Sequence, residues 1–348
     1  MRILFCGDPH FRYELPYASA IRDGRRGEWE AVKKTIVDAS KTCDAVVLMG
    51  DNFNSRNNHS SVIREFIDFL NEFGDKEVHI LAGNHERYQT STALDFLKNL
   101  NHKKWYVYTK PTQTKVAGQD IMMIPYMTPA LLGVETKEDG IKAILDSFPR
   151  DAWPLCAAHH GVAGARIHGM PIDFMNEIVL PQKELEQHFS HVFAGHVHGK
   201  QHIFPSIYMT GNITTNEVGE YEKSIWIYES DGTIDVEVKE VKLPVRQIHK
   251  VEVGTTDEGF FNIASIPNNS IVKVIVTDRS VVMDEVRKAV ERFDANIIIE
   301  QYPNERAKTH FEAGAMDLSV ENLLKLYAEA KGLPHSDLLD GFELIKQN

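Results

Sequence analysis

The chain has little cysteine and no long apolar segment. Its 348 residues include three cysteines, Cys6, Cys43 and Cys156, whose scattered positions match no metal-binding spacing. This usage argues against a disulfide-stabilised scaffold and is typical of a reduced, cytoplasmic protein. We find no signal peptide, no internal repeat and no apolar run long enough to cross a bilayer, so we expect no membrane insertion.

Positive charge is also scarce. Acidic residues outnumber basic ones by 50 to 38, which gives a formal net charge of −12. Because contacts to phosphates dominate affinity for nucleic acid, this balance argues against tight DNA binding by the chain alone. Positive charge is locally dense at Arg12, Arg22, Arg25 and Arg26. Such a loop can follow a nucleic-acid backbone, or it is a solvated insertion, and the sequence leaves both interpretations open.

Short apolar runs alternate with helical patterns in the first part of the chain. The apolar runs, which we interpret as strands buried on both faces, cover residues 1–6, 45–49, 78–81, 154–158 and 191–194. The helical patterns cover residues 28–40, 62–73 and 94–100. This alternation predicts an α/β layer architecture. In open α/β sheets, ligands bind beyond the carboxyl ends of the strands.

Four short fragments place polar side chains at those predicted ends. They are Asp8-Pro9-His10, Gly50-Asp51-Asn52, Gly83-Asn84-His85-Glu86 and Gly195-His196-Val197-His198. Each fragment alone is a common pattern. In this order they supply two Asp, one Asn and several His, enough to hold two metal ions side by side for phosphate-ester hydrolysis.

The spacing within two of the fragments has a structural meaning. Pro9 favours an extended backbone at Asp8, and residues two apart in an extended segment point the same way. Asp8 and His10 can therefore hold one ion. His196 and His198 share this spacing, although two adjacent ions would let each serve a different metal.

The remaining ligand candidates come from three other predicted strand ends. Asp51 has two carboxylate oxygens and can bridge two ions, and Asn84 offers a neutral amide oxygen. His159 and His160 follow the run that ends at residue 158. We favour His159 as the ligand because it directly follows the run, while a buried structural pair remains the alternative.

The charge of this ligand set indicates what the site can do. Two carboxylates and neutral imidazoles would leave two divalent ions with an excess of positive charge, which lowers the pKa of a bound water and holds a phosphodiester. Mixed imidazole and oxygen ligands suit Mn, Fe or Zn better than Ca or Mg. The residues alone do not distinguish Mn from Fe or Zn.

The fragments together resemble the calcineurin-like metallophosphoesterase superfamily over about residues 1–240. The resemblance implies a four-layer αββα sandwich and a general-acid role for His85, which would protonate the leaving oxygen. It also implies a first metal held by Asp8, His10, Asp51 and His198. The second metal would be held by Asp51, Asn84, His159 and His196.

Within the superfamily, the second fragment is most similar to the SbcD, or meiotic recombination eleven, nuclease family. Serine/threonine protein phosphatases carry Asp-Arg-Gly after this motif, whereas this chain continues to Phe53 and Arg56. Tyr208-Met209-Thr210-Gly211-Asn212, Gly219-Glu220 and Lys223 extend the similarity. Asn54 stands where some family members carry a His that assists the transition state, and Asn cannot shuttle a proton. Exonuclease rate and polarity are therefore not predicted.

The residues from 245 onward carry no catalytic motif. We expect a nuclease domain over 1–244 and a small α/β capping domain over 245–312, with a strand at 270–277, a helix at 282–293 and a strand at 295–301. A helical segment follows at 313–348. Its apolar stripe, Val320, Leu323, Leu324 and Tyr327, has the spacing of a helix that docks into a groove. By resemblance the groove belongs to a partner ATPase, and packing on the chain's own domain is the alternative.

The sequence therefore predicts an Mn-dependent DNA exonuclease and endonuclease, a subunit of an SbcCD-type complex for recombination and double-strand-break processing. The implied partners are DNA, an SbcC-type coiled-coil ATPase and a second copy of the chain, forming a homodimer within a heterotetramer through helices near residues 62–73. The candidate DNA contacts are Arg12, Arg22, Arg25, Arg26 and Arg56. Two alternatives remain: a phosphoesterase acting on phosphoproteins or small phosphodiesters, and a non-catalytic scaffold.

Overall fold

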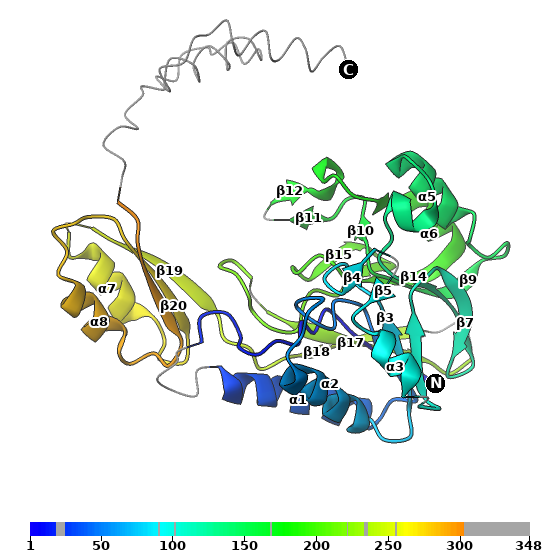
Figure 1. Ribbon diagram of the computed structural model, residues 1–348, viewed down its shortest axis with the longest axis horizontal. Coiled ribbons are helices and arrows are strands. Elements are labelled where there is room, and N and C mark those ends of the chain that lie inside the picture. The colour runs from blue at the N-terminus through cyan, green and yellow to red at the C-terminus, as the bar shows by residue number, and fades with distance from the viewer. Residues whose placement is uncertain are drawn as a thin grey trace, which may run out of the picture.

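The computed structural model describes residues 1–18, 25–89, 91–100, 102–167, 169–220, 222–232, 236–254 and 256–302. The larger part of the fold is built on two six-stranded sheets that pack face to face, with helices on both outer faces (Figure 1). This is the predicted α/β sandwich. The expected C-terminal helical segment, with its stripe Val320, Leu323, Leu324 and Tyr327, lies outside the described residues.

The first sheet has the strand order β18-β17-β1-β2-β3-β6. Strands β1, β2, β3 and β6 run parallel, and β17 and β18 are antiparallel additions. The bounds are β1 (Arg2–Cys6), β2 (Ala45–Leu48), β3 (Glu77–Leu81), β6 (Trp105–Tyr108), β17 (Ser224–Ser230) and β18 (Val236–Lys242). Its outer face is covered by α1 (Arg26–Ser40), α2 (Ser60–Asn71) and α3 (Asp95–Asn99).

The second sheet has the order β15-β16-β14-β9-β8-β7, with parallel central strands and antiparallel edges. The bounds are β7 (Thr112–Val116), β8 (Gln119–Ile124), β9 (Trp153–Ala158), β14 (Phe189–Ala194), β15 (Gln201–Phe204) and β16 (Ile207–Met209). Its outer face carries α4 (Pro129–Leu132), α5 (Lys137–Leu145) and α6 (Gln182–His188).

Short elements lie in the loops that connect these strands. Three pairs of two-residue strands are β4 (Arg87–Tyr88) with β5 (Ser91–Thr92), β10 (Gly161–Val162) with β13 (Val179–Leu180), and β11 (Arg166–Ile167) with β12 (Met170–Pro171). A single 3₁₀ turn, η1 (Ile172–Phe174), follows β12.

The layering follows from alternation along fully apolar strands. In β1, Leu4 and Cys6 face the helices of the first outer layer, while Ile3 and Phe5 face the second sheet. Successive side chains of a strand point to opposite faces. A continuous apolar run therefore contributes side chains both to the core under the helices and to the core between the two sheets. Across the sheet interface, the rings of Phe5 and Phe193 stack with their centroids 4.0 Å apart.

A smaller unit, which we name the cap, follows the sandwich and lies to one side of it (Figure 1). It comprises β19 (Ile248–Val253), α7 (Glu258–Ser265), β20 (Ile271–Val276), α8 (Met283–Val290) and β21 (Asn296–Glu300). The three strands are parallel and share a separate apolar core with the two helices. The expected strand–helix–strand pattern corresponds to β20, α8 and β21, while β19 and α7 were not predicted.

Ion pairs connect the cap to the sandwich. Glu28 of α1 accepts hydrogen bonds from Arg25 and, at 2.9 Å, from Nε of Arg246 in the linker. Arg246 also pairs with Asp294 of the cap. A backbone bridge joins Ala18 to Ala295. The cap is therefore anchored to the loop that follows the first metal motif.

The three cysteines are buried and unpaired. Within the described residues, no helix combines the length and the apolarity needed to cross a membrane.

Candidate metal centre

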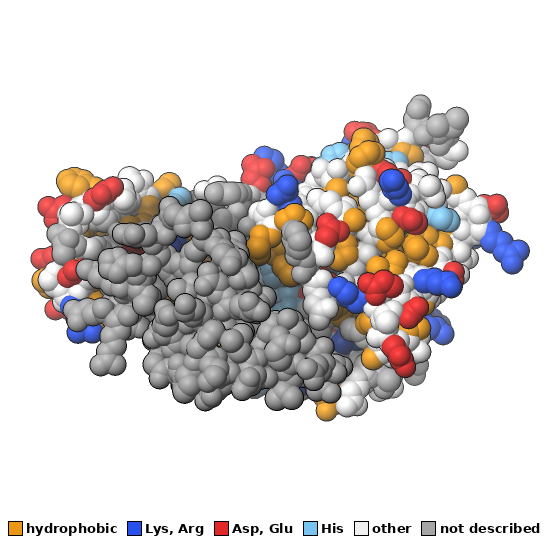
Figure 2. Space-filling view, turned by 90° about the horizontal axis from the view of Figure 1, so that it is seen from above, with side chains coloured by type: hydrophobic (Ala, Val, Ile, Leu, Met, Phe, Trp, Pro, Cys, Tyr) orange, Lys and Arg blue, Asp and Glu red, His pale blue; other side chains and the backbone are white. Residues whose placement is uncertain are grey.

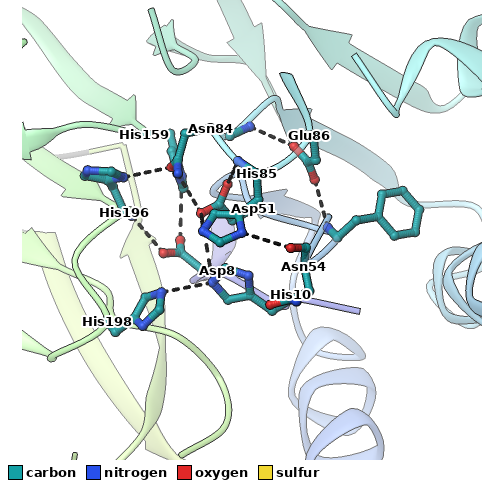
Figure 3. Close-up of polar contacts among 12 residues, drawn as sticks. Asp8, His10, Asp51, Asn54, Asn84, His85, Glu86, His159, His196 and His198 are labelled. Atoms are coloured by element: carbon teal, nitrogen blue, oxygen red, sulfur yellow. Dashed lines mark hydrogen bonds and ion pairs between the residues drawn. The ribbon is translucent and has the colours of Figure 1, made fainter. Parts of the chain in front are cut away.

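All of the predicted ligands lie beyond the carboxyl ends of central parallel strands. Asp8 and His10 follow β1, Asp51 follows β2, and Asn84 and His85 follow β3. From the second sheet, His159 follows β9, and His196 and His198 follow β14. The two sheets present these ends at the same edge of the sandwich, so the side chains converge there (Figure 3).

Glycines in the motifs allow the loops to approach one another. A Cβ at Gly83 would lie 2.1 Å from the Asp51 backbone nitrogen, and one at Gly195 would lie 2.4 Å from Asp8 Oδ1. Both distances are far below van der Waals contact, so any larger residue would push the ligand loops apart. Gly83 and Gly195, which precede Asn84 and His196, are thus packing requirements of the cluster.

Three candidate ligands have a left-handed backbone, which is uncommon for residues other than glycine. His10 has φ 49°, Asp51 has φ 45° and His196 has φ 80°. Backbone strain of this kind persists where the surrounding structure imposes it, and it clusters at functional sites. Here hydrogen bonds fix the turns, since His10 N donates to Asp51 O at 2.8 Å and His196 N donates to Asp8 Oδ2 at 2.8 Å.

Asp51 occupies the middle of the cluster. Its Oδ1 accepts a hydrogen bond from the His85 backbone at 2.9 Å. Its Oδ2 lies 3.4 Å from His159 Nε2 and 3.9 Å from His10 Nε2. It belongs to two of the three groups of side chains with metal-binding geometry in the described structure, the third being formed by Asp8, His10 and His198. This position is the one a bridging carboxylate needs.

Contacts of His159 and His196 hold these two side chains in the tautomers that metal ligation requires. His159 Nδ1 donates to the Met49 carbonyl at 2.7 Å, which leaves the lone pair of Nε2 facing Asp51. His196 Nε2 donates to Glu177 at 2.9 Å, which leaves Nδ1 facing Asn84 Oδ1, also at 2.9 Å. Acceptors on the far nitrogen of a ligating histidine fix its tautomer and orientation.

The group formed by Asp8, His10 and His198 also fits a cation. His198 Nδ1 lies 3.5 Å from Glu220, which leaves Nε2 directed at His10 Nε2, 3.1 Å away. Asp8 Oδ1 is buried and has no hydrogen-bond partner among the described residues. A buried acceptor without a partner is costly, and convergent nitrogen and oxygen lone pairs are what a divalent cation binds. The residues present therefore fit the two metal ions.

Burial and mutual repulsion dominate the electrostatics. Burial, and then the nearby Asp51, raise the pKa of Asp8 well above its usual value. Burial alone would raise the pKa of Asp51 too, but His159, His10 and His85 together lower it. Burial also lowers the pKa of His10, so its imidazole is neutral and available as a ligand. Two cations would offset the repulsion between the carboxylates.

His85 lies beside the cluster rather than within it. Its Nδ1 donates to the backbone carbonyl of Asn54 at 2.9 Å, and its Nε2 lies 3.9 Å from Asp51 Oδ2. The side chain is 37% exposed, whereas that of Asp51 is 1% exposed. Nε2 is therefore accessible to a substrate. Asn54 contributes its carbonyl here, a role that does not depend on the identity of its side chain.

Three acidic residues around the cluster were not predicted as part of the site. Glu177 orients His196, and Glu220 lies beside His198 and accepts from the Asn216 backbone at 2.6 Å. Glu86 is fully buried and accepts from the Gly83 and Phe53 backbones at 2.7 and 2.9 Å, so it joins two ligand loops. Its burial, and then Asp51, raise its pKa to about 8.

His160 points away from the cluster. Its Nε2 accepts from Met127 N at 3.0 Å, and its Nδ1 lies 3.2 Å from Ile178 O. Burial lowers its pKa to about 3. The structure therefore places His159 among the candidate ligands and gives His160 structural contacts, in line with the preference for His159.

The predicted DNA-contacting arginines are in different environments. Arg25 is 1% exposed, and its guanidinium bonds to Glu28 and to the carbonyls of Pro16 and Thr215. No donor face remains for a phosphate, so Arg25 is a structural residue rather than a backbone contact. The i,i+3 pairing of Arg25 with Glu28 was the sequence signal that could have indicated this.

The other arginines divide between the site and the surface. Arg12 lies next to the cluster, with Nε donating to the His10 carbonyl at 3.2 Å, and burial and Arg25 lower its pKa to about 10. Arg26 is half exposed and pairs with Glu30 and Glu65. Arg56 is exposed and stacks on a tyrosine ring. Arg22 lies outside the described residues.

An open hollow of about 990 Å³ adjoins the cluster. His196 and His198 form part of its wall, and Arg166, Lys200 and Lys223 contribute positive charge that is balanced by acidic neighbours. Histidine side chains are visible at the bottom of a depression near the middle of the molecule (Figure 2). The candidate metal centre is therefore reachable from solvent.

Comparisons with known proteins agree with this geometry at the level of the family. A family model described as calcineurin-like phosphoesterase matches residues 1–200. No curated protein matches the chain.

Several solved structures are similar. A dimetal phosphatase from Danio rerio gives a TM-score of 0.44 at 12% identity, covering 70% of this chain and 98% of that one. TT1561 of Thermus thermophilus gives 0.36 at 14% identity, covering 69% and 98%. A Vps29 double mutant from Entamoeba histolytica gives 0.26 at 13% identity, covering 70% and 99%.

Proposed function

Because the family match covers more than half of its length, the chain belongs to the calcineurin-like phosphoesterase family, and we propose that it is a metal-dependent DNA nuclease. In this proposal it is the nuclease subunit of an SbcCD-type complex that processes double-strand breaks. The family itself implies a metal-dependent hydrolase of phosphate esters. The choice of DNA as substrate rests on the size of the hollow beside the site.

The observation that carries the proposal is a cluster of candidate ligands for two ions beside a large open hollow. A pocket of about 990 Å³ is at the upper end of the sizes found for small-molecule sites. It adjoins His196 and His198 on one side of the cluster and leaves room for a chain that continues beyond a scissile phosphate. A phosphomonoester needs no such space, whereas a polynucleotide does.

We assign the ligands to two ions according to which side-chain nitrogen and oxygen atoms converge. Asp8, His10, Asp51 and His198 would hold one ion, and Asp51, Asn84, His159 and His196 the other. Two bound ions supply a low-pKa water and neutralise charge on the phosphate. We propose Mn as the metal, with Fe or Zn as alternatives and Mg less suited to these imidazole ligands.

His85 is proposed as the general acid. The Asn54 carbonyl holds the Nδ1 proton, so a second proton carried on Nε2 can pass to the leaving oxygen as the P–O bond breaks. A general acid must be within hydrogen-bond reach of the atom it protonates. The exposure of the His85 side chain beside Asp51 meets that condition.

The partner proposals rest on the sequence. A net charge of −12 disfavours tight DNA binding by the chain alone, so an SbcC-type ATPase would supply most of the DNA-binding surface. We propose that residues 319–330 dock on it and that two nuclease chains pair near residues 62–73. Arg12, which lies beside His10, and Arg56, which lines a hollow together with Glu86, would contact the DNA.

A substrate panel tests the proposal. Purified protein with Mn²⁺ is offered linear duplex DNA, single-stranded DNA, bis(p-nitrophenyl) phosphate, p-nitrophenyl phosphate and a phosphopeptide, with and without the ATPase. We expect cleavage of DNA and of the diester, and faster duplex degradation with ATPase and ATP. Hydrolysis confined to a monoester or phosphopeptide would overturn the nuclease assignment. A protein that binds no metal and hydrolyses nothing would indicate a scaffold.

A further inference from the structure

A second, smaller hollow lies on the other side of the cluster from the large one. It has a volume of about 370 Å³, and its lining includes Arg56, Glu86, Tyr88 and Thr92. Figure 3 shows His196 and His198 on one side of Asp51 and His85, and Asn54 and Glu86 on the other. The large hollow adjoins the two histidines, and the small one adjoins Glu86. A chain molecule that crosses the metal centre would therefore enter both.

The small hollow contains a stacked pair of side chains. The Arg56 guanidinium carbon lies 4.7 Å from the centroid of the Tyr88 ring. The tyrosine is 53% exposed and belongs to no apolar core cluster in the described structure. Tyr88 sits on the short hairpin of β4 and β5. The fold thus presents a flat aromatic and cationic surface to solvent without using it for packing.

This surface is close to the proposed general acid. Tyr88 is three residues after His85, and three residues span at most about 11 Å of extended chain. Arg56 is two residues after Asn54, whose carbonyl holds His85 Nδ1 at 2.9 Å. The group that protonates a leaving oxygen lies on the leaving-group side of the phosphate. The small hollow is therefore on the side from which the leaving nucleoside departs.

We propose that Tyr88 and Arg56 form a stacking subsite for the base of the leaving nucleoside, an inference that rests on the proposed nuclease function. Aromatic rings and arginine planes stack nucleobases without reading their edges. The subsite would hold any of the four bases and would place the leaving oxygen near His85 Nε2. It would also favour DNA ends or strands whose bases are unpaired, because a paired base has no free face.

Oligonucleotides with a single abasic nucleoside test the subsite. The abasic nucleoside, a tetrahydrofuran analogue, is placed at a different position in each oligonucleotide. The cleavage products then identify which nucleoside leaves at each cut. For the wild type we expect kcat/KM to fall about tenfold when the leaving nucleoside lacks its base, in line with the worth of one base stack. An abasic residue on the other side of the scissile bond should have a much smaller effect.

Variants connect this discrimination to the residues. Tyr88→Leu should reduce the ratio between base-bearing and abasic leaving nucleosides to about one, and Tyr88→Phe should preserve it. Phe261→Leu is the control, since Phe261 is 75% exposed on the cap and distant in sequence from the site. A variant that merely misfolds would cleave both the base-bearing and the abasic substrates less well. The ratio between the two rates would then stay at the wild-type value.

The outcomes distinguish a failure of the subsite proposal from a failure of the nuclease proposal. A ratio in Tyr88→Leu that equals the wild-type ratio would overturn the subsite alone. A wild type that cleaves oligonucleotides with no abasic effect would do the same. A wild type that hydrolyses bis(p-nitrophenyl) phosphate but no oligonucleotide would overturn the nuclease proposal, and the subsite with it.

Discussion

The metal end of the sandwich and the cap are both built from parallel strands and covering helices, but their interiors differ. At the metal end Asp8, His10, Asp51 and His159 are each at most 1% exposed. In the cap, the core cluster consists of apolar side chains such as Val274 and Val286. The non-glycine residues with positive φ in the described structure all precede the cap. The metal end of the sandwich contains buried charged groups and strained backbone, whereas the cap core does not.

The difference shows how function affects stability in this chain. Burying carboxylates and leaving acceptors unpaired costs free energy, and a ligand that binds only the folded state recovers it by mass action. The sandwich should therefore gain stability from metal, while the cap should not. Hydrogen exchange of β1 and β2 compared with β19 and β20, with and without metal, would measure this contrast.

The largest effect is expected for Asp51→Asn. Loss of the shared carboxylate should empty or disorder both metal positions and abolish hydrolysis, because Asp51 lies in two of the three candidate groups. Metal content and activity should fall together. Full metal occupancy in this variant would show that Asp51 does not bridge.

His85→Ala should separate chemistry from metal binding. Only the His85 backbone contacts Asp51 within hydrogen-bond distance, so the variant should retain both metals and its folded stability. Activity should fall by about 10²–10⁴-fold, the usual contribution of a general acid. His160→Ala is the comparison variant, because His160 faces Met127 and Ile178. Normal turnover by His85→Ala would remove it from the mechanism.

Glu28→Gln tests the connection between the two regions. Glu28 has a side chain 3% exposed and pairs with buried Arg25 and with Arg246 of the linker. Breaking a buried pair leaves an uncompensated charge and costs about 3–5 kcal/mol. We expect a lower unfolding temperature and earlier proteolysis near the linker, with metal content unchanged. Glu30→Gln, at an exposed position of the same helix, is the control.

Glu177→Gln should weaken metal binding without abolishing it. The carboxylate fixes His196 with Nδ1 directed at the cluster, and removing such a partner typically costs about 10–100-fold in metal affinity. Isothermal titration with Mn²⁺ would measure the change. Glu184→Gln on α6 is a suitable control, because it lies outside the candidate ligand groups. Wild-type affinity in Glu177→Gln would assign the orientation of His196 to other contacts.

Local patterns predicted the α/β layer architecture and the clustering of the ligands, and the resemblance to the superfamily implied the sandwich. Continuous apolar strands ended by Gly and a polar ligand fix where each side chain must lie. Glu177 escaped prediction because it comes from a loop 19 residues before His196, with no periodic signal. In the cap, β19 was missed because Ile248–Val253 mixes charged and apolar residues. Arg25 was misjudged because a loop arginine was assumed to be solvated.

The smallest effect concerns acid stability and a buried histidine away from the metal. His79 is 2% exposed between the sheets, where its Nδ1 lies 2.8 Å from the Tyr108 hydroxyl. Burial lowers its pKa to about 4, despite the opposing effect of Glu77. The unfolded chain, with a histidine pKa near 6.5, therefore takes up a proton that the folded state refuses. Stability should be complete above about pH 6.5 and decline as the pH falls toward 4.

This single histidine should lower the free energy of unfolding by about 1.4 kcal/mol at pH 5.5 relative to pH 7.5. At pH 5.5 protonation favours the unfolded chain about tenfold, and a factor of ten is worth about 1.4 kcal/mol. His79→Gln should reduce the difference in denaturant midpoint between these two pH values in metal-free protein. His102→Gln, at an exposed position, should leave the difference unchanged. The cap core cluster contains no histidine in the described structure, so its hydrogen exchange should lack this pH dependence. Equal acid sensitivity of the sandwich and the cap would contradict the contrast between them.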